Sequence, residues 1–149
     1  MEKFNCKEDI IYLIRHLAKL LQADFDRRIS EFGLTGGQAR VLFFIIRCDG
    51  ENIEVHQNDI EKEFSLAKST VNGLVSRLLK TGYIIKRNVH PYAVLEPTEE
   101  GKKAVAKIRQ GRIDTINKLF KGYTAEEKQM TLEKLNILID NLEGGKEDD

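Results

Sequence analysis

The stretch from residue 56 to residue 97 constrains the fold most, because its pattern changes twice within a short distance. "HQNDIEKEF" favours a short helix that ends at Phe64, and the following "SL" marks a tight break. "AKSTVNGLVSRLLKTG" then carries apolar residues at helical spacing and ends in Gly82. "YIIKRNVHPYAVLEPT" alternates and is partly β-branched, which favours strands at 84–88 and 92–96 joined as a hairpin. A short helix, a turn, a second helix and a hairpin together predict a winged helix-turn-helix.

A long helix is predicted on the N-terminal side of this stretch. Apolar residues at 8–32 follow helical spacing, and their stripe is wide enough for contacts on more than one side. Gly33 supplies a stop for this helix. Thr35 and Gln38 then form a capping-box pattern, in which the hydroxyl and the amide side chain each satisfy a free backbone N–H. This pattern predicts a second helix that ends near Cys48.

Two further helices are predicted on the C-terminal side. Thr98 is placed to cap the first of them, with two glutamates in the first turn. Thr124 and Glu127 form a second capping-box pattern, which predicts a last helix that ends near Leu142. We expect residues 143–149 to be a flexible tail.

These patterns predict a single domain that is mainly α-helical with a small β-hairpin wing. The winged helix-turn-helix occupies residues 34–97, and long helices flank it at 8–32 and 98–142. A chain of 149 residues, 41% of them hydrophobic, is long enough to bury a real core.

The composition favours a cytoplasmic protein with no membrane span. "MEKFNCKEDIIYLI" has charges where a signal peptide needs an apolar run. The longest apolar run, "VLFFII" at 41–46, is far too short to cross a bilayer. Two cysteines far apart, with no secretion signal, are typical of the reducing cytoplasm.

The charge pattern points to a partner for the predicted second helix. The chain has 24 acidic and 24 basic residues, yet residues 64–95 contain no acid. The bases of this stretch are Lys68, Arg77, Lys80, Lys86 and Arg87. The second helix of a helix-turn-helix lies in the major groove of DNA, where a carboxylate would be repelled by phosphates. Bases there would neutralise phosphates and release counterions.

Three segments resemble the MarR family of bacterial transcription regulators. "GLTGGQARVL" is similar to the family's pattern of Leu-Thr, Gln and a later Val-Leu. "HQNDIEKEFSLAKSTVNGLVSRLLKTGYIIKR" resembles its helix-turn-helix, and "LEPTEEGKKAV" resembles the Leu-Thr-Glu-x-Gly that opens the helix after the wing. The three segments span residues 33–105 in the family's order and spacing.

The resemblance implies a homodimer on double-stranded DNA. In this family the first helix and the last two interlock with those of a second subunit, so 8–32 and 98–142 would be dimerisation helices. The two recognition helices would enter successive major grooves. The operator would then be a pseudo-palindrome with half-sites roughly 34–36 Å apart. Repression is the commoner mode of action in the family.

The DNA-contacting residues can be named from the helix geometry and the resemblance. Val71, Leu74, Val75 and Leu78 are expected to face the core. The residues left to face DNA are Lys68, Ser69, Thr70, Asn72, Gly73, Ser76 and Arg77. Asn72 and Arg77 are the candidates for base contacts, since asparagine pairs with adenine and arginine with guanine. The residues expected to contact DNA from the wing are Lys86, Arg87 and His90.

The chain departs from the family's pattern at three places. The wing is short and lacks the Asp-x-Arg whose arginine enters the minor groove, and His90 is a weak substitute for that arginine. Ala67 stands where a small hydroxyl residue often caps the recognition helix, which loses about 1 kcal/mol of capping unless Ser65 compensates. Pro97 replaces an apolar residue and is expected to shorten the second strand by one residue. These changes suggest weaker minor-groove readout without loss of DNA binding.

The sequence names no effector, cofactor or metal. The family often binds small anionic aromatic ligands between the dimer helices and the DNA-binding lobe. Tyr12, His16 and Arg40 could line such a pocket, but a structural role is favoured for each. The three histidines lie on different elements, and neither cysteine has metal-ligand spacing to them. Cys6 precedes the first helix, so it does not fit the pattern of the family's peroxide sensors, and Cys48 is expected in the core.

The remaining alternatives belong to other classes. The chain has no phosphate-cradling glycine loop, nucleophile elbow or paired-histidine zinc motif, so an enzyme is not expected. The alternative that stays open is a winged-helix protein-interaction module whose basic face contacts an acidic partner. The missing wing arginine keeps this alternative open. The two differ in salt dependence, because a DNA binder must lose affinity steeply as salt rises.

Overall fold

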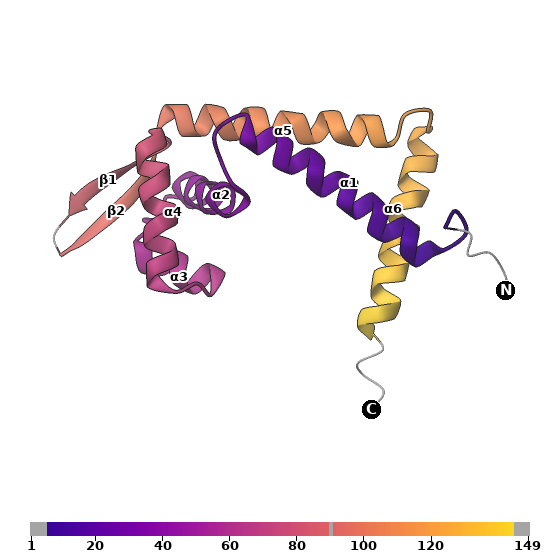
Figure 1. The fold of residues 1–149 in the computed structure, drawn as a ribbon, viewed down its shortest axis with the longest axis horizontal. Helices are drawn as coiled ribbons and strands as arrows, with labels where there is room; N and C mark the ends of the chain where they lie inside the picture. The colour runs from indigo at the N-terminus through magenta and orange to yellow at the C-terminus, as the bar shows by residue number, and fades with distance from the viewer. Residues whose placement is uncertain (1–5, 90, 145–149) are drawn as a thin grey trace. The chain divides into compact units, whose positions relative to one another are not determined.

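A computed structural model describes residues 6–89 and 91–144, and within them the chain forms six helices and one hairpin (Figure 1). The elements are α1 Ile10–Ser30, α2 Gly36–Gly50, α3 Gln57–Phe64, α4 Lys68–Thr81, β1 Ile84–Val89, β2 Tyr92–Pro97, α5 Glu99–Leu119 and α6 Ala125–Glu143. The chain divides into two compact units, Met1–Arg112 and Ile113–Asp149, and the division falls within α5. The predicted fold class, mainly α with a β-hairpin wing, is confirmed.

The core of the first unit is built around α2. This helix packs against α4 and β2, and α3 packs against α4 and β2 in turn. Leu42 and Ile45 of α2 are fully buried, as is Ile60 of α3. On α4 the predicted core positions Val71, Val75 and Leu78 are buried, whereas Leu74 is half-buried. The spacing of these four residues turns the polar residues of α4 outward.

Local signals in the sequence set the ends of the helices. The capping box of α2 is confirmed, because the Gln38 backbone N–H donates to Thr35 Oγ1 at 3.5 Å and the Thr35 N–H to Gln38 Oε1 at 3.2 Å. This helix runs to Gly50, past the predicted end. Ser65 and Gly82 both adopt left-handed backbone conformations, with φ of 51° and 77°, and these conformations end α3 and α4.

The hairpin is joined to the helices by an extra bridge. β1 and β2 pair antiparallel, and Val55 adds an isolated bridge to Leu95, whose N–H donates to the Val55 carbonyl at 2.8 Å. The expectation that Pro97 shortens the second strand is wrong, because Pro97 is the last residue of β2, opposite Ile84. The Thr98 N–H donates to the Tyr83 carbonyl at 3.0 Å. Pro97 and Ile84 therefore form a non-hydrogen-bonded pair, in which the backbone nitrogen of residue 97 points away from β1. Proline has no N–H to leave unpaired there.

The start of α5 is fixed to the junction between α4 and the wing. Thr98 Oγ1 accepts from the Gly101 N–H at 3.1 Å, as the capping prediction requires, and its hydroxyl donates to the Gly82 carbonyl at 2.6 Å. Gly101 lies directly against Tyr83, so that a Cβ at this position would stand 2.2 Å from the Tyr83 carbonyl oxygen. The first turns of α5 therefore close the winged-helix unit.

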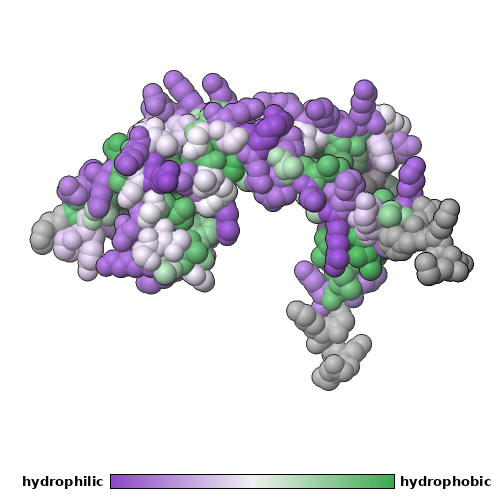
Figure 2. Space-filling view, in the orientation of Figure 1, coloured by the Kyte–Doolittle hydropathy of each residue, from purple (hydrophilic) through white to green (hydrophobic). Residues whose placement is uncertain are grey.

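Two helices carry apolar side chains that the single chain does not cover. α6 begins with the predicted capping box, in which Thr124 Oγ1 accepts from the Glu127 N–H at 3.1 Å. Figure 2 shows hydrophobic residues on the visible face of α6. The exposed large apolar residues of this helix are Met130, Leu132, Leu135, Ile137, Leu138, Ile139 and Leu142. Those of α1 are Ile10, Ile11, Tyr12, Leu13, Ile14, Leu17, Leu20 and Leu21. Neither these nor any other described helix is long and apolar enough to cross a membrane.

Candidate nucleic-acid interface

The outer face of α4 carries every residue that the sequence assigned to the recognition helix. The exposed residues there are Lys68, Ser69, Thr70, Asn72, Gly73, Ser76 and Arg77. Because Val71, Val75 and Leu78 face the core, these polar residues lie together on the exposed side of α4. This face combines cations, hydroxyls and an amide, which are the groups that contact phosphates and base edges.

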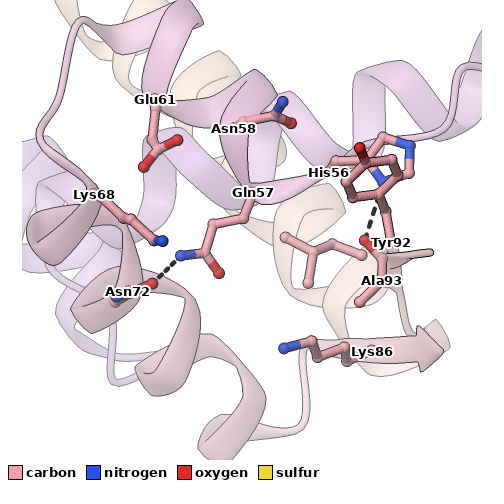
Figure 3. Close-up of a pocket in the computed structure, with 10 residues that line it drawn as sticks. His56, Gln57, Asn58, Glu61, Lys68, Asn72, Lys86, Tyr92 and Ala93 are labelled. Atoms are coloured by element: carbon pink, nitrogen blue, oxygen red, sulfur yellow. Dashed lines mark hydrogen bonds between the residues drawn. The ribbon is translucent and has the colours of Figure 1, made fainter. Parts of the chain in front are cut away.

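A hollow of about 420 Å³ lies between this face and the wing (Figure 3). Its lining residues are His56, Gln57, Asn58, Glu61, Lys68, Asn72, Lys86, Tyr92, Ala93 and Leu95. Of the residues predicted to contact DNA, the hollow brings together Lys68 and Asn72 from α4 and Lys86 from β1. Figure 3 shows the ammonium groups of Lys68 and Lys86 pointing into the same space beside Gln57. Glu61 adds one carboxylate to the lining, so the two lysines leave the hollow with a positive balance of charge that suits an anionic partner.

The beginning of α3 supplies polar residues that sequence reasoning missed. Gln57 donates a hydrogen bond from its side-chain amide to Asn72 Oδ1 on α4. His56 Nδ1 lies 3.0 Å from the Ala93 carbonyl oxygen, and its ring makes an edge contact with Tyr92, with 6.0 Å between ring centroids. The polar run "HQN" at the start of the helix was the available signal, but which elements these side chains reach depends on the tertiary fold.

Arg87 lies apart from the other predicted residues. Its Nε is 2.7 Å from Glu96 Oε1 and its Nη2 is 3.5 Å from Glu54 Oε1. The hydrogen bond to Glu96 and the charge of that carboxylate raise the pKa of Arg87. Successive residues of a strand point to opposite faces, so Arg87 faces away from the hollow that Lys86 lines. The two carboxylates partly neutralise this arginine. His90, the last wing residue predicted to contact DNA, lies outside the described residues.

The N-terminus of α4 lacks a side-chain cap. Ala67 occupies the N-cap position with extended backbone, and its methyl group has no atom that can accept a hydrogen bond. The first backbone N–H groups of α4 are therefore left to solvent or to a bound anion. This agrees with the capping loss expected from the sequence.

The other candidate residues have structural surroundings. The guanidinium of Arg40 lies 5.1 Å from the centre of the Phe64 ring, and Tyr12 stacks on His16 with 5.8 Å between ring centroids. Cys48 is buried, and this burial raises the pKa of its thiol, whereas Cys6 is half-exposed. In residues 6–89 and 91–144, no group of three His, Cys, Asp or Glu side chains is arranged to hold a metal ion.

Comparison with known proteins identifies this architecture. The sequence model of the MarR family matches residues 32–90, which include α2, the whole helix-turn-helix and β1. Residues 32–90, which hold the helix-turn-helix, are thus matched by the MarR family of winged-helix transcription regulators. The matched family is one of transcription regulators, which agrees with the regulator predicted from the sequence.

Two curated regulators resemble the chain over most of its length. It is 25% identical to the transcriptional repressor YetL of Bacillus subtilis (strain 168) over 114 residues, which is 74% of this chain and 66% of YetL. The chain thus spans just under two thirds of YetL. It is 24% identical to the transcriptional regulator BilQ of Clostridioides difficile (strain CD3) over 136 residues, which is 89% of both chains.

Solved MarR-type structures share the fold. MepR, a transcription regulator of the Staphylococcus aureus multidrug efflux pump MepA, superposes with a TM-score of 0.80 at 20% identity, covering 90% of this chain and 98% of MepR. MepR in its complex with DNA superposes with a TM-score of 0.77 at 20% identity, covering 88% and 98%. At this identity the likeness shows the fold, including the helices on both sides of the winged lobe.

Proposed function

We propose that this chain binds double-stranded DNA as a homodimer and represses transcription at a pseudo-palindromic operator. The observation that carries the proposal is the exposed, acid-free face of α4 beside a hollow with Lys68 and Lys86 on opposite walls. The MepR–DNA complex, with the same fold, and the repressor YetL support it. A DNA-bound regulator of this kind acts in the cytoplasm.

The residues of the proposed interface divide by chemistry. Asn72 and Arg77 are positioned for base edges, since their side chains can form paired hydrogen bonds with adenine and guanine. Ser69, Thr70 and Ser76 suit phosphate oxygens, and Gly73 lets the helix approach the groove closely. Lys68 and Lys86 neutralise phosphates on the two sides of the hollow, which fixes the register of α4 in the groove.

Arg87 has a smaller part in this proposal than its sequence position suggested. Its pairing with Glu96 and Glu54 leaves less positive charge for a phosphate, and it faces away from Lys86. His90, which lies between the two strands in the sequence, remains a proposed contact with DNA.

The apolar faces of α1 and α6 support the dimer. An exposed surface that is this rich in large apolar residues is costly in water and marks a surface that another protein covers. The exposed fractions are 61% for Ile11, 55% for Leu20 and 51% for Ile137. A second copy of the chain covers such faces by symmetry, because the same patch then meets its own equivalent. The dimer sets the spacing of two α4 helices at roughly 34–36 Å, one turn of DNA.

Regulation would act on this spacing. A small molecule that binds between the dimer helices and the winged lobe shifts the two α4 helices, so that they no longer fit adjacent grooves. The residues of such a site remain unassigned, because Tyr12, His16 and Arg40 have the structural contacts described above.

Two observations favour a second candidate function. The neutralised Arg87 and the wing without Asp-x-Arg are features of a winged helix that contacts a protein instead of a minor groove. Such a module would use the same basic face for an acidic partner.

The deciding experiment is binding of the purified protein to duplex DNA from upstream of its own coding region, with excess competitor DNA, across a salt series. The proposal predicts competitor-resistant binding whose affinity falls with salt at about 0.9 log units per log unit of salt for each phosphate contacted. Lys68→Ala should reduce this slope. Lys62→Ala, which removes the same charge from a lysine that lines a separate groove with Phe44 and Cys48, should not. Binding no better than to competitor, even at low salt, would favour the protein-interaction module.

A further inference from the structure

The side chain of Gln57 joins the two helices of the helix-turn-helix at the proposed interface. Gln57 is the first residue of α3, is half-buried, and donates its amide N–H to Oδ1 of Asn72 on α4. Figure 3 shows this bond at the edge of the hollow, with the nitrogen of Asn72 pointing away from Gln57. Asn72 is exposed and belongs to the face assigned to DNA.

The hydrogen bond from Gln57 restricts the orientation of the Asn72 side-chain amide. The oxygen and nitrogen of a side-chain amide have nearly the same size, so an exposed asparagine can present either group in a given direction. With Gln57 as the donor, as in this structure, only one orientation of the Asn72 amide fits, because the donor needs the Asn72 oxygen and would meet two N–H donors in the other orientation. The second lone pair of Oδ1 and the N–H₂ group of Asn72 are left as a neighbouring acceptor and donor.

The pattern that remains is complementary to adenine. In the major groove, adenine presents the N6 amino group as a donor and N7 as an acceptor, and asparagine reads both at once. An amide that is already oriented does not lose rotational freedom when it binds, so its preference for adenine is larger than that of a free side chain. A residue outside the recognition helix thereby determines what the recognition helix reads.

We propose that Gln57 is a specificity-determining positioning residue, which holds the amide of Asn72 in the orientation that reads adenine. This inference rests on the proposed function, because it assumes that α4 enters the major groove. Gln57 itself need not touch a base, and its effect acts through Asn72 alone.

The contact can be tested first without DNA. In the free protein, NMR spectra of the side-chain amides should show one Gln57 amide proton that exchanges slowly and shifts when Asn72→Ala is introduced. The same shift should be absent with Asn58→Ala, since Asn58 is the next residue of α3 and lines the same hollow. Fast exchange of both Gln57 amide protons in the folded wild-type protein would overturn the inference.

The effect on readout is tested with a duplex selected from random DNA by the wild-type protein. Each position of the half-site is replaced in turn, and the position at which Asn72→Ala removes the preference for adenine is the one that Asn72 reads. Gln57→Met, which keeps the length of the side chain but has no amide, should lower the adenine preference at that position by about 3- to 10-fold, a part of the roughly 5- to 150-fold that one paired contact contributes. In the Asn72→Ala background, Gln57→Met should change no preference further.

The outcomes separate the inference from the function on which it rests. An adenine preference that survives Gln57→Met, or an equal loss of affinity for all sequences in both backgrounds, would overturn the inference and leave the DNA-binding proposal intact. A wild-type protein with no base preference at any position would overturn both. Circular dichroism and cooperative thermal unfolding show that Gln57→Met is folded.

Discussion

Gly101→Ala should destabilise the chain strongly although alanine is the better helix former. Gly101 is buried in the first turn of α5, and a Cβ there would lie 2.2 Å from the Tyr83 carbonyl oxygen and 3.0 Å from the Tyr83 carbonyl carbon. Both of these atoms belong to the backbone, which cannot rotate away as a side chain can. The methyl group must therefore push α5 away from the junction of α4 and β1.

The magnitude follows from three contributions. Overpacking in a well-packed site costs about 1–3 kcal/mol. The displacement also weakens the 3.0 Å hydrogen bond from the Thr98 N–H to the Tyr83 carbonyl, at a cost of about 0.5–1.5 kcal/mol. Replacing glycine by alanine in a helix returns about 1 kcal/mol. The net loss is about 2 kcal/mol, which lowers Tm by about 4–8 °C for a domain of this size.

The matched control is Gly73→Ala in α4. Within the described part of the chain, a Cβ at Gly73 would meet no atom within 4 Å, so only the helix propensity changes. This variant should gain about 0.5–1 kcal/mol. Both are measured by thermal unfolding at one fixed protein concentration, because the Tm of a dimer depends on concentration. A Tm of Gly101→Ala at or above that of the wild type would refute the packing described for the start of α5.

Three further predictions concern the surface and the thiols. Lys86→Ala should lower the salt slope of DNA binding by about 0.9 for each phosphate that this lysine neutralises. Arg87→Ala should change the slope much less, because two carboxylates already neutralise that arginine. Equal changes would contradict the assignment of Lys86 and Arg87 to opposite faces. A thiol reagent should modify Cys6 in the folded protein and reach Cys48 only on unfolding, because burial shields the Cys48 thiol and raises its pKa. Modification of both cysteines at the same rate would contradict this prediction. Leu138→Glu on α6 should weaken self-association by about tenfold or more in sedimentation experiments, because an unpaired charge is costly in a buried interface. An unchanged dimer would exclude this face of α6 from the dimer interface.

Features encoded by neighbouring residues could be predicted from the sequence. The capping boxes at Thr35 and Thr124 use side chains three residues apart, so the sequence alone contains both partners. Gly82 ends α4 because its left-handed backbone conformation suits glycine. The outward face of α4 followed from the spacing of its four apolar residues.

Features that depend on distant partners could not be predicted in the same way. The bond between Gln57 and Asn72 joins two helices, and the pairing of Arg87 with Glu54 crosses from the wing to the segment before α3. No local pattern contains both partners of either interaction. The acid-free stretch at 64–95 suggested a uniformly free set of cations, but folding brings Glu54 and Glu96, which lie outside that stretch, to Arg87. The sequence therefore indicated a candidate interface but could not show that Arg87 is paired with carboxylates.

The central claim, that two copies of α4 read one operator, is tested most directly by selecting binding sites from a library of random duplex DNA with the purified protein. Two α4 helices on one operator should enrich a pseudo-palindrome whose half-site centres lie about 10–10.5 base pairs apart. A library that shows no enriched sequence after repeated selection, or one enriched in a single half-site without a symmetric partner, would contradict it.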